Sequence, residues 1–293
     1  MKTRIIQDEP PPRPRVTAAT PAPDGGSAGP REPGFLLGLV RRHPLAGFVL
    51  LSYAFAWCLL PFGTFLPFGP LLAALVVVPM FRGLAGLREL GARIARWRVG
   101  WVWYLAAIAV PLLVHLVTTW VNVAIGGSKP EFSQFTPWYA VLLVFLVHLV
   151  DPTLGPLGEE PGWRGVAQPL LQSRRSPLAA AGMLALIVTG WHLPLAFMPQ
   201  FDLGPADLGT TAVITFWYAW LFNRSGGSVL LTIIAHASEG TVDLNALWPA
   251  VDDASRQSWL WLVVWTTVVL GLVLVDRRAW VGREGPLGPA HPR

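Results

Sequence analysis

Eight apolar stretches follow residue 43, and they constrain the fold of this chain more than any other feature of its sequence. A helix that crosses the hydrocarbon core of a bilayer needs about 20 predominantly apolar residues. The stretches therefore predict an all-α, polytopic membrane protein with about eight transmembrane helices. They cover residues 44–61, 63–81, 101–125, 137–155, 177–197, 208–222, 228–248 and 259–275.

The composition supports a membrane domain and argues against nucleic acid as a partner. Charged residues make up 13% of the chain and the mean hydropathy is +0.49, whereas ordinary soluble domains are about 25% charged. The basic residues lie mainly in short loops between apolar stretches, a pattern typical of membrane topology. The single cysteine, Cys58, excludes an intramolecular disulfide framework and a cysteine metal cluster. The lipid bilayer is therefore the first partner that the sequence predicts.

The chain divides into a tail, a membrane domain and a second, short tail. Residues 1–34 are rich in proline and glycine and lack the apolar core of a signal peptide, so we expect a disordered cytoplasmic tail. Residues 35–280 form the predicted multi-pass domain, and residues 281–293 a short C-terminal tail. Within the domain, residues 82–99 alternate basic and apolar residues at helical spacing and predict an amphipathic helix at the membrane interface.

The distribution of basic residues predicts the orientation in the cell membrane. With the N-terminus in the cytoplasm and eight crossings, 20 of the 22 Lys and Arg residues fall on the cytoplasmic side, and only Lys129 and Arg256 fall outside. Both termini are then cytoplasmic. This count requires residues 158–173 to continue the fourth helix on the cytoplasmic side, after a bend at Pro152 and Pro156.

Ionisable side chains within the apolar stretches are the candidates for function, because each costs about 2.5–3.5 kcal/mol to insert into a membrane. His148 and Asp151 are three residues apart and are interpreted as a structural pair. His115 is interpreted as a packing or interhelical hydrogen-bonding residue. The full set is His115, His148, Asp151, Glu159, Glu160, Arg164, His192, His236, Glu239 and Asp243.

The segment GEEPGWRG at residues 158–165 predicts different roles for its two adjacent glutamates. Glu160 and Arg164 are four residues apart, so on a helix they share a face and can pair. Glu159 is rotated by about 100° and has no arginine at this spacing. One glutamate is therefore expected to be structural and the other free for proton transfer. The alternative is an ordinary salt bridge beside a solvated glutamate at the cytoplasmic surface.

Two histidines lie at depths that match Glu159. His192 and Glu159 are about equally far from the basic turn at 174–177, so an antiparallel helical hairpin places them level. His236 lies eight residues into its stretch, or about 12 Å deep at 1.5 Å per residue. Glu239, three residues further on, is a candidate to orient the ring of His236, and an equal alternative is that it faces a water-filled cavity. The alternative for His192 is a helix-end role before Pro194.

A buried carboxylate and two histidines suit hydrolysis of a peptide bond. Glu159 can activate water, a histidine can share its proton, and the other histidine can stabilise the oxyanion. The same three residues, Glu159, His192 and His236, are also ligand types of a catalytic zinc site. These two mechanisms both remain open, and no HExxH, GxSxG or Walker motif is present.

Three segments together resemble the motifs of the CPBP family of intramembrane proteases, the CAAX-processing and bacteriocin-processing enzymes also called the ABI family. EEPGWRGVAQPLL resembles a Glu-Glu-x-x-x-Arg motif, VTGWHLPLAF a Phe-x-x-x-His motif, and SVLLTIIAHASEG a His-x-x-x-Asn motif. The motifs fall within residues 137–248. The resemblance implies about eight transmembrane helices and an endopeptidase site open to the cytoplasmic side.

The resemblance also implies a role for each candidate residue. Glu159 activates water with help from His192, Glu160 pairs with Arg164, and His236 supports the oxyanion. The substrate implied is a membrane-associated protein or peptide, and both metal-dependent and metal-free mechanisms are argued for the family.

Two positions depart from the family pattern and leave alternatives open. Val188 stands at the Phe position of the second motif, and Gly240 at the Asn position of the third. Glu239 or Asn245 is a candidate replacement for the missing amide. The alternative function is a catalytically silent relative that acts as a membrane scaffold or immunity-type binding protein. A proton-coupled transporter would also use buried acids and histidines, but the chain has no internal repeat of the kind such folds use.

Overall fold

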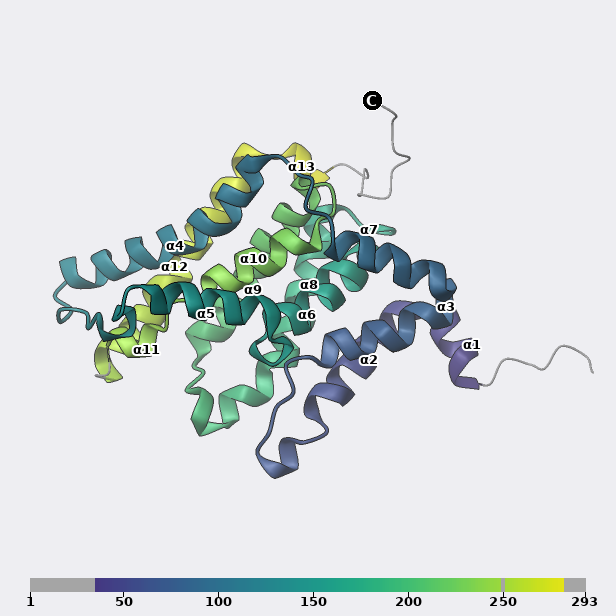
Figure 1. Cartoon of the computed structure of the whole chain (residues 1–293), viewed down its shortest axis with the longest axis horizontal. Helices are drawn as coiled ribbons and strands as arrows, with labels where there is room; N and C mark the ends of the chain where they lie inside the picture. The colour runs from purple at the N-terminus through teal and green to yellow at the C-terminus, as the bar shows by residue number, and fades with distance from the viewer. Residues whose placement is uncertain (1–34, 249–250, 282–293) are drawn as a thin grey trace, which may run out of the picture. The chain divides into compact units, whose positions relative to one another are not determined.

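The computed structural model describes residues 35–248 and 251–281, and all the regular elements in these ranges are helices (Figure 1). The chain divides into two units, Met1–Gly34 and Phe35–Arg293, and the described residues all belong to the second unit. The tails expected at 1–34 and 281–293 lie outside the described residues, except for Val281, which ends a short helix. The all-α prediction is therefore confirmed for the part of the chain that is described.

The helices are α1 (Phe35–Arg42), α2 (Pro44–Trp57), α3 (Gly69–Ile94), α4 (Trp101–Ala124), α5 (Tyr139–Val150), α6 (Pro156–Gly162), α7 (Gln168–Gln172), α8 (Pro177–His192), α9 (Pro205–Arg224), α10 (Val229–Glu239), α11 (Leu244–Leu247), α12 (Val251–Val275) and α13 (Arg278–Val281). A π-helical segment, Trp163–Ala167, joins α6 to α7. Short 3₁₀ turns lie at Leu60–Phe62, Ser133–Phe135, Pro152–Leu154, Leu193–Phe197 and Pro199–Phe201.

Five helical segments in the described ranges are long and apolar enough to cross a membrane, which indicates an integral membrane protein. Helices α5 and α10 are apolar but have only 12 and 11 residues. Helix α9 has 20 residues but is not one of the five. The number of eight crossings and the N-in, C-in orientation stay predictions. The five segments are Pro44–Phe62, Gly69–Ile94, Trp101–Ala124, Pro177–Phe197 and Asp253–Val275.

The second apolar stretch and the expected amphipathic helix are joined in α3. The helix runs through both and bends at Gly83, where φ is +63°. Only glycine adopts this conformation without strain, so the residue allows an abrupt change of direction. The helical segment after the bend ends at Ile94, so the expectation of a helix up to residue 99 was wrong for its last turn.

The bend expected after the fourth stretch is present. Helix α5 ends at Val150, and the carboxylate of Asp151 accepts a hydrogen bond from the backbone N–H of Thr153 at 2.8 Å. Gly155, at φ +101°, then redirects the chain into α6. The expected pair of His148 and Asp151 is not formed as a hydrogen bond among the described residues, because the Nδ1 of His148 donates to the backbone carbonyl of Val144 instead, at 2.9 Å.

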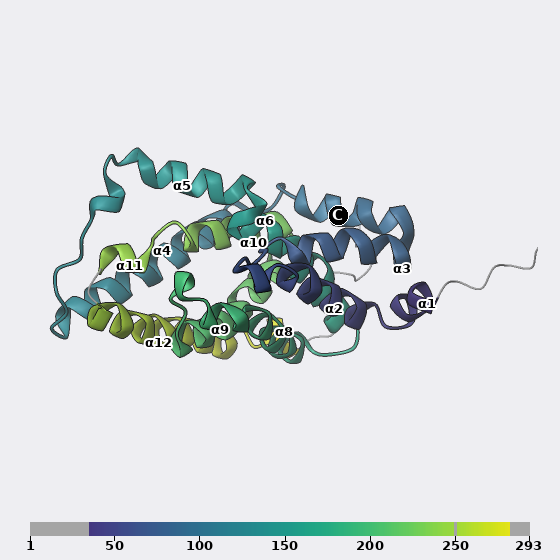
Figure 2. The same ribbon diagram turned by 90° about the horizontal axis from the view of Figure 1, so that it is seen from below.

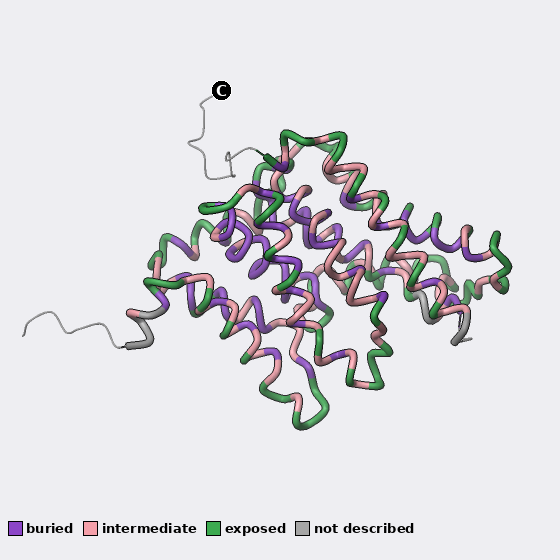
Figure 3. Tube along the Cα trace, turned by 180° about the vertical axis from the view of Figure 1, so that it is seen from behind, coloured by how far each residue is buried: buried purple, intermediate pink, exposed green. Residues whose placement is uncertain are grey.

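Helix α6 packs against α3 through glycine. A Cβ built on Gly162 would lie 2.6 Å from both Cβ and the carbonyl oxygen of Pro70, and one built on Gly158 would lie 2.8 Å from Cα of Phe68. Small residues let two backbones approach closely inside a membrane. Figure 2 shows α5 along one edge, with α6 and α10 next to it. Buried residues gather along the inner helices (Figure 3).

Candidate functional site

Glu159 and Glu160 lie in α6, which begins directly after the turn at Gly155. Pro156 occupies the first turn of the helix, where the missing N–H costs no hydrogen bond. The chain continues without interruption into the π segment, which carries Arg164. Such π segments inside helices occur frequently at functional sites. Both glutamates and Arg164 are buried, at 5%, 0% and 2% exposure respectively.

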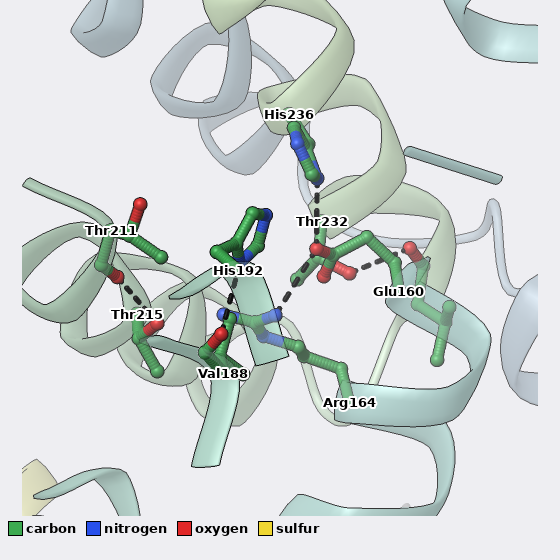
Figure 4. A network of polar contacts seen from close by, with 9 residues as sticks. Glu160, Arg164, Val188, His192, Thr211, Thr215, Thr232 and His236 are labelled. Carbon is green, nitrogen blue, oxygen red and sulfur yellow. Dashed lines mark hydrogen bonds and ion pairs between the residues drawn. The ribbon is translucent and has the colours of Figure 1, made fainter. Parts of the chain in front are cut away.

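Glu160 is held by two partners at one oxygen (Figure 4). Its Oε1 accepts from a guanidinium nitrogen of Arg164 at 3.1 Å, as the spacing of four residues predicts. The same Oε1 lies 3.0 Å from Nδ1 of His236 in α10. The contact between Glu160 and His236 was not foreseen, because residues on different helices leave no spacing signal. Glu160 is therefore the carboxylate that orients the His236 ring. Of the two alternatives for Glu239, the ring-orienting role was wrong, and its side chain faces a cavity instead.

The aromatic ring of Tyr218, in α9, supports both cationic partners of Glu160. The guanidinium carbon of Arg164 lies 4.9 Å from the centroid of the Tyr218 ring. The ring of His236 stacks on the same tyrosine, with centroids 5.4 Å apart. Aromatic faces attract such cations, and the attraction is stronger away from water. Tyr218 thus fixes the positions of two residues, and sequence analysis did not identify it because an apolar helix commonly contains tyrosine.

A cavity of about 240 Å³ brings all five candidate residues together. Its lining comes from α6, the π segment, α8, α9, α10 and α12. Glu239 and Asp207 add carboxylates to the wall, and Thr211 and Thr215 add hydroxyl groups. The convergence of residues from three sequence motifs on one space is what their matching depths predicted. The five candidates are Glu159, Glu160, Arg164, His192 and His236.

His192 closes α8, and its Nδ1 lies 2.9 Å from the backbone carbonyl oxygen of Val188 (Figure 4). A carbonyl only accepts, so Nδ1 carries the hydrogen and Nε2 has a free lone pair in the neutral ring. The hydrogen bond fits the helix-end role that the sequence allowed. It also leaves Nε2 as the nitrogen available to accept a proton in the cavity.

Glu159 differs from its neighbour because its carboxylate has no hydrogen bond or ion pair within residues 35–248 and 251–281. A Cβ built on Gly155 would lie 3.1 Å from Oε1 of Glu159 and 3.7 Å from Nε2 of His236. Both atoms therefore face the same small space beside the Gly155 backbone. A side chain at position 155 would fill it.

The residues proposed for a zinc alternative do not form a ligand cluster. Glu159, His192 and His236 line the same cavity. Within the described ranges, however, no three His, Cys, Asp or Glu side chains are grouped closely enough to hold one metal ion. The arrangement as it stands does not fit a metal ion.

The remaining candidates have separate positions. His115, in α4, makes the interhelical hydrogen bond expected of it, with Nε2 2.9 Å from the backbone oxygen of Glu239. The carboxylate of Glu239 lines the cavity, so this residue remains a candidate for the missing amide. The side chain of Asn245 lies outside the described residues. Gly240 directly follows α10 and is exposed.

The fold and the cavity define a class, an integral membrane protein with a buried cluster of acids and histidines. Residues 136–241 match the family described as type II CAAX prenyl endopeptidase Rce1-like. The chain is also similar to CAAX prenyl protease 2 of Methanococcus maripaludis, with 27% identity over 141 residues, which cover 42% of this chain and 49% of the relative. The match thus spans about half the length of this curated relative. Residues 136–241 are a domain of the Rce1-like family, and all five candidate residues fall within it.

Proposed function

We propose that the chain is an intramembrane endopeptidase that hydrolyses a peptide bond in a membrane-associated protein or peptide. The observation that carries this proposal is the difference between the two glutamates in one cavity. Glu160 is held by Arg164 and His236, whereas Glu159 is buried and unpaired among the described residues. An unpaired carboxylate beside histidines can take a proton from water and return it.

The hydrogen-bond partners give the two histidines opposite tasks. His192 donates from Nδ1 to a neutral carbonyl, so its Nε2 is an acceptor that can share the proton of water. His236 donates from Nδ1 to a carboxylate, which favours the doubly protonated ring, with a hydrogen also on Nε2. His236 is then the donor that stabilises negative charge on the substrate oxygen.

The reaction proceeds in two steps, addition of water to the substrate carbonyl and then cleavage of the carbon–nitrogen bond. Glu159, assisted by His192, removes a proton from water, and the water oxygen bonds to the carbonyl carbon of the substrate. The carbonyl oxygen becomes an oxyanion, which His236 stabilises. The carbon–nitrogen bond then breaks, and Glu159 returns the proton to the departing amine, so the products are a carboxylic acid and an amine.

The comparisons and the site's place among apolar helices support this substrate class. The relative's name points to peptides that end in a prenylated CAAX sequence, and such a peptide is the first probe. The second candidate function is a catalytically silent membrane scaffold or immunity-type binding protein. Gly240 favours it, because a glycine has no side chain to support an oxyanion.

The test uses the purified full chain in detergent. A farnesylated CAAX peptide, its unprenylated form and a mixed peptide library are incubated with the protein, and products are identified by mass spectrometry. The wild type is compared with Glu159→Gln and with the control Glu131→Gln, whose exposed side chain does not line the cavity. We expect cleavage by the wild type and the control only. Equal cleavage by Glu159→Gln would contradict the mechanism, and no cleavage by the wild type would favour the silent relative.

The zinc alternative is tested on the same samples. The metal content of the purified protein is measured, and cleavage is repeated after treatment with a chelator. We expect cleavage to persist after chelation, because the three possible ligands are not grouped around one point. Loss of cleavage that added zinc restores would require the metal mechanism instead.

A further inference from the structure

The space next to Gly240 is filled by a residue from another helix. A Cβ built on Gly240 would lie 3.1 Å from Cδ2 and 3.2 Å from Nε2 of His148. These separations are shorter than ordinary van der Waals contact. The edge of the His148 ring therefore stands where a side chain at position 240 would begin.

This space lies on the face of α10 that serves the cavity. Residues 236 and 240 are four apart, so side chains at these positions share a face. His236 lines the cavity from this face. The same neighbouring segment covers both positions, because Gly155 lies beside His236 and His148 beside Gly240. His148 is thus about one helical turn from the space shared by Glu159 and His236.

The orientation of His148 leaves one ring nitrogen free. Its Nδ1 donates to the carbonyl oxygen of Val144, at 2.9 Å, which keeps the ring directed along α5. Its Nε2 is the atom next to Gly240. The carboxylate of Asp151, three residues further on, is close enough to interact electrostatically with His148. Because Nδ1 already donates to Val144, Nε2 donates only when the ring carries a second proton. The side chain is half-buried, so a substrate can reach it.

We propose that His148, in its doubly protonated form, supplies the hydrogen-bond donor that position 240 lacks, and that its Nε2 donates to the carbonyl oxygen of the substrate in the transition state. This inference rests on the proposed endopeptidase function. It makes His148 a catalytic residue that sits on α5 instead of α10. No covalent bond to His148 forms or breaks, since it contributes a hydrogen bond alone.

The experiment moves the donor between the two helices. His148→Phe keeps a ring of similar size but has no donor, His148→Gln keeps a donor, and the double variant His148→Ala with Gly240→Asn returns an amide to α10. Cleavage of whichever peptide the wild type processes is measured as kcat and KM. Thermal unfolding of each variant is recorded to verify folding.

We expect His148→Phe to lower kcat about 10²–10³-fold, the usual loss for one oxyanion donor, with KM within about twofold because the contact forms in the transition state. His148→Gln should retain most of the wild-type kcat. The double variant should be faster than His148→Ala by about tenfold or more, because the amide replaces the lost donor. If His148 had only a structural role, adding a side chain at position 240 would not restore the kcat that His148→Ala loses.

The outcomes separate this proposal from the function on which it rests. Wild-type cleavage that is lost in Glu159→Gln but unchanged in His148→Phe would overturn the role of His148 and leave the endopeptidase function standing. Failure of Gly240→Asn to improve folded His148→Ala would overturn it as well. If the wild type cleaves no peptide, and Gly240→Asn alone confers cleavage, His148 does not replace the donor. If neither cleaves, both proposals are wrong.

Discussion

Nδ1 of His236 lies 3.0 Å from Oε1 of Glu160, although the two residues are 76 positions apart in the chain. The same oxygen accepts from Arg164 at 3.1 Å. One buried carboxylate therefore joins α6, the π segment and α10. This contact explains why two adjacent glutamates have different properties, because it engages Glu160 and leaves Glu159 free.

Replacing Glu160 should destabilise the fold. Glu160→Gln leaves Arg164, which is 2% exposed, without its anion. Removing one partner of a buried ion pair typically costs about 3–5 kcal/mol, because the remaining charge is uncompensated. The measurement is unfolding in detergent, with Glu89→Gln as the matched control. The pair of Glu89 and Arg82 is exposed, at 48% and 43%, so its loss should cost under about 1 kcal/mol. Equal effects from the two variants would contradict this prediction.

Two substitutions at Tyr218 should distinguish the contribution of its ring from that of its hydroxyl group. The hydroxyl has no hydrogen-bond partner among the described residues, so Tyr218→Phe should change stability and cleavage little. Tyr218→Leu removes the aromatic face under Arg164 and beside His236 and should cost about 2 kcal/mol or more. Unfolding of both variants, measured together, checks the difference. If Tyr218→Phe is as damaging as Tyr218→Leu, the hydroxyl and not the ring is the important group.

A methyl group at Gly162 should disturb the site by displacing α6 from α3. Its Cβ would lie 2.6 Å from the backbone of Pro70, so α6 would have to move away from α3 and carry both glutamates with it. We expect Gly162→Ala to lower stability by about 1–3 kcal/mol and to reduce cleavage. The control is Gly271→Ala in α12, where a Cβ meets nothing within 4 Å. There the higher helix propensity of alanine should stabilise by up to about 1 kcal/mol. If both substitutions changed the stability in the same direction, the result would argue against close packing at Gly162.

The features that the sequence predicted are those encoded by nearby residues. Apolar length predicted membrane helices, and the spacing of Glu160 and Arg164 predicted their contact, because helical geometry alone brings them together. Proline and glycine after residue 150 predicted the bend before α6. The matching depths of His192 and His236 correctly indicated a shared cavity, since helical rise converts chain length into height.

The features that sequence analysis missed depend on contacts between distant segments. Glu239 was one candidate partner of His236 because it is three residues away, but Glu160 on another helix takes that position. The approach of His148 to Gly240 likewise has no local signal. The bend at Gly83 was also missed, because glycine is common in membrane helices and only backbone geometry reveals its positive φ.

The stability of the folded protein should depend on pH through Asp276, which follows α12. Arg224 donates to both of its carboxylate oxygens, and Trp220 donates to one of them at 2.8 Å. The hydrogen bonds from Arg224, followed by the smaller contribution of Trp220, lower the pKa of Asp276 below its ordinary value of 3.8. The unfolded chain therefore takes up a proton before the folded protein does. The stabilisation is fully present above the ordinary value and is lost as the pH falls below it, through the folded pKa.

The measurement is the difference in unfolding temperature between the wild type and Asp276→Asn at several pH values. We expect the wild type to be more stable at about pH 6 and the difference to shrink steadily below about pH 4, because protonation weakens the same contacts that the substitution removes. The exposed pair of Arg82 and Glu89 provides the control, since the loss of an exposed pair in Glu89→Gln should change the unfolding temperature much less at about pH 6. A difference that is constant from neutral to acid pH would mean that the contact between Arg224 and Asp276 adds nothing to stability, and that α9 and α12 are held at this end by apolar packing alone.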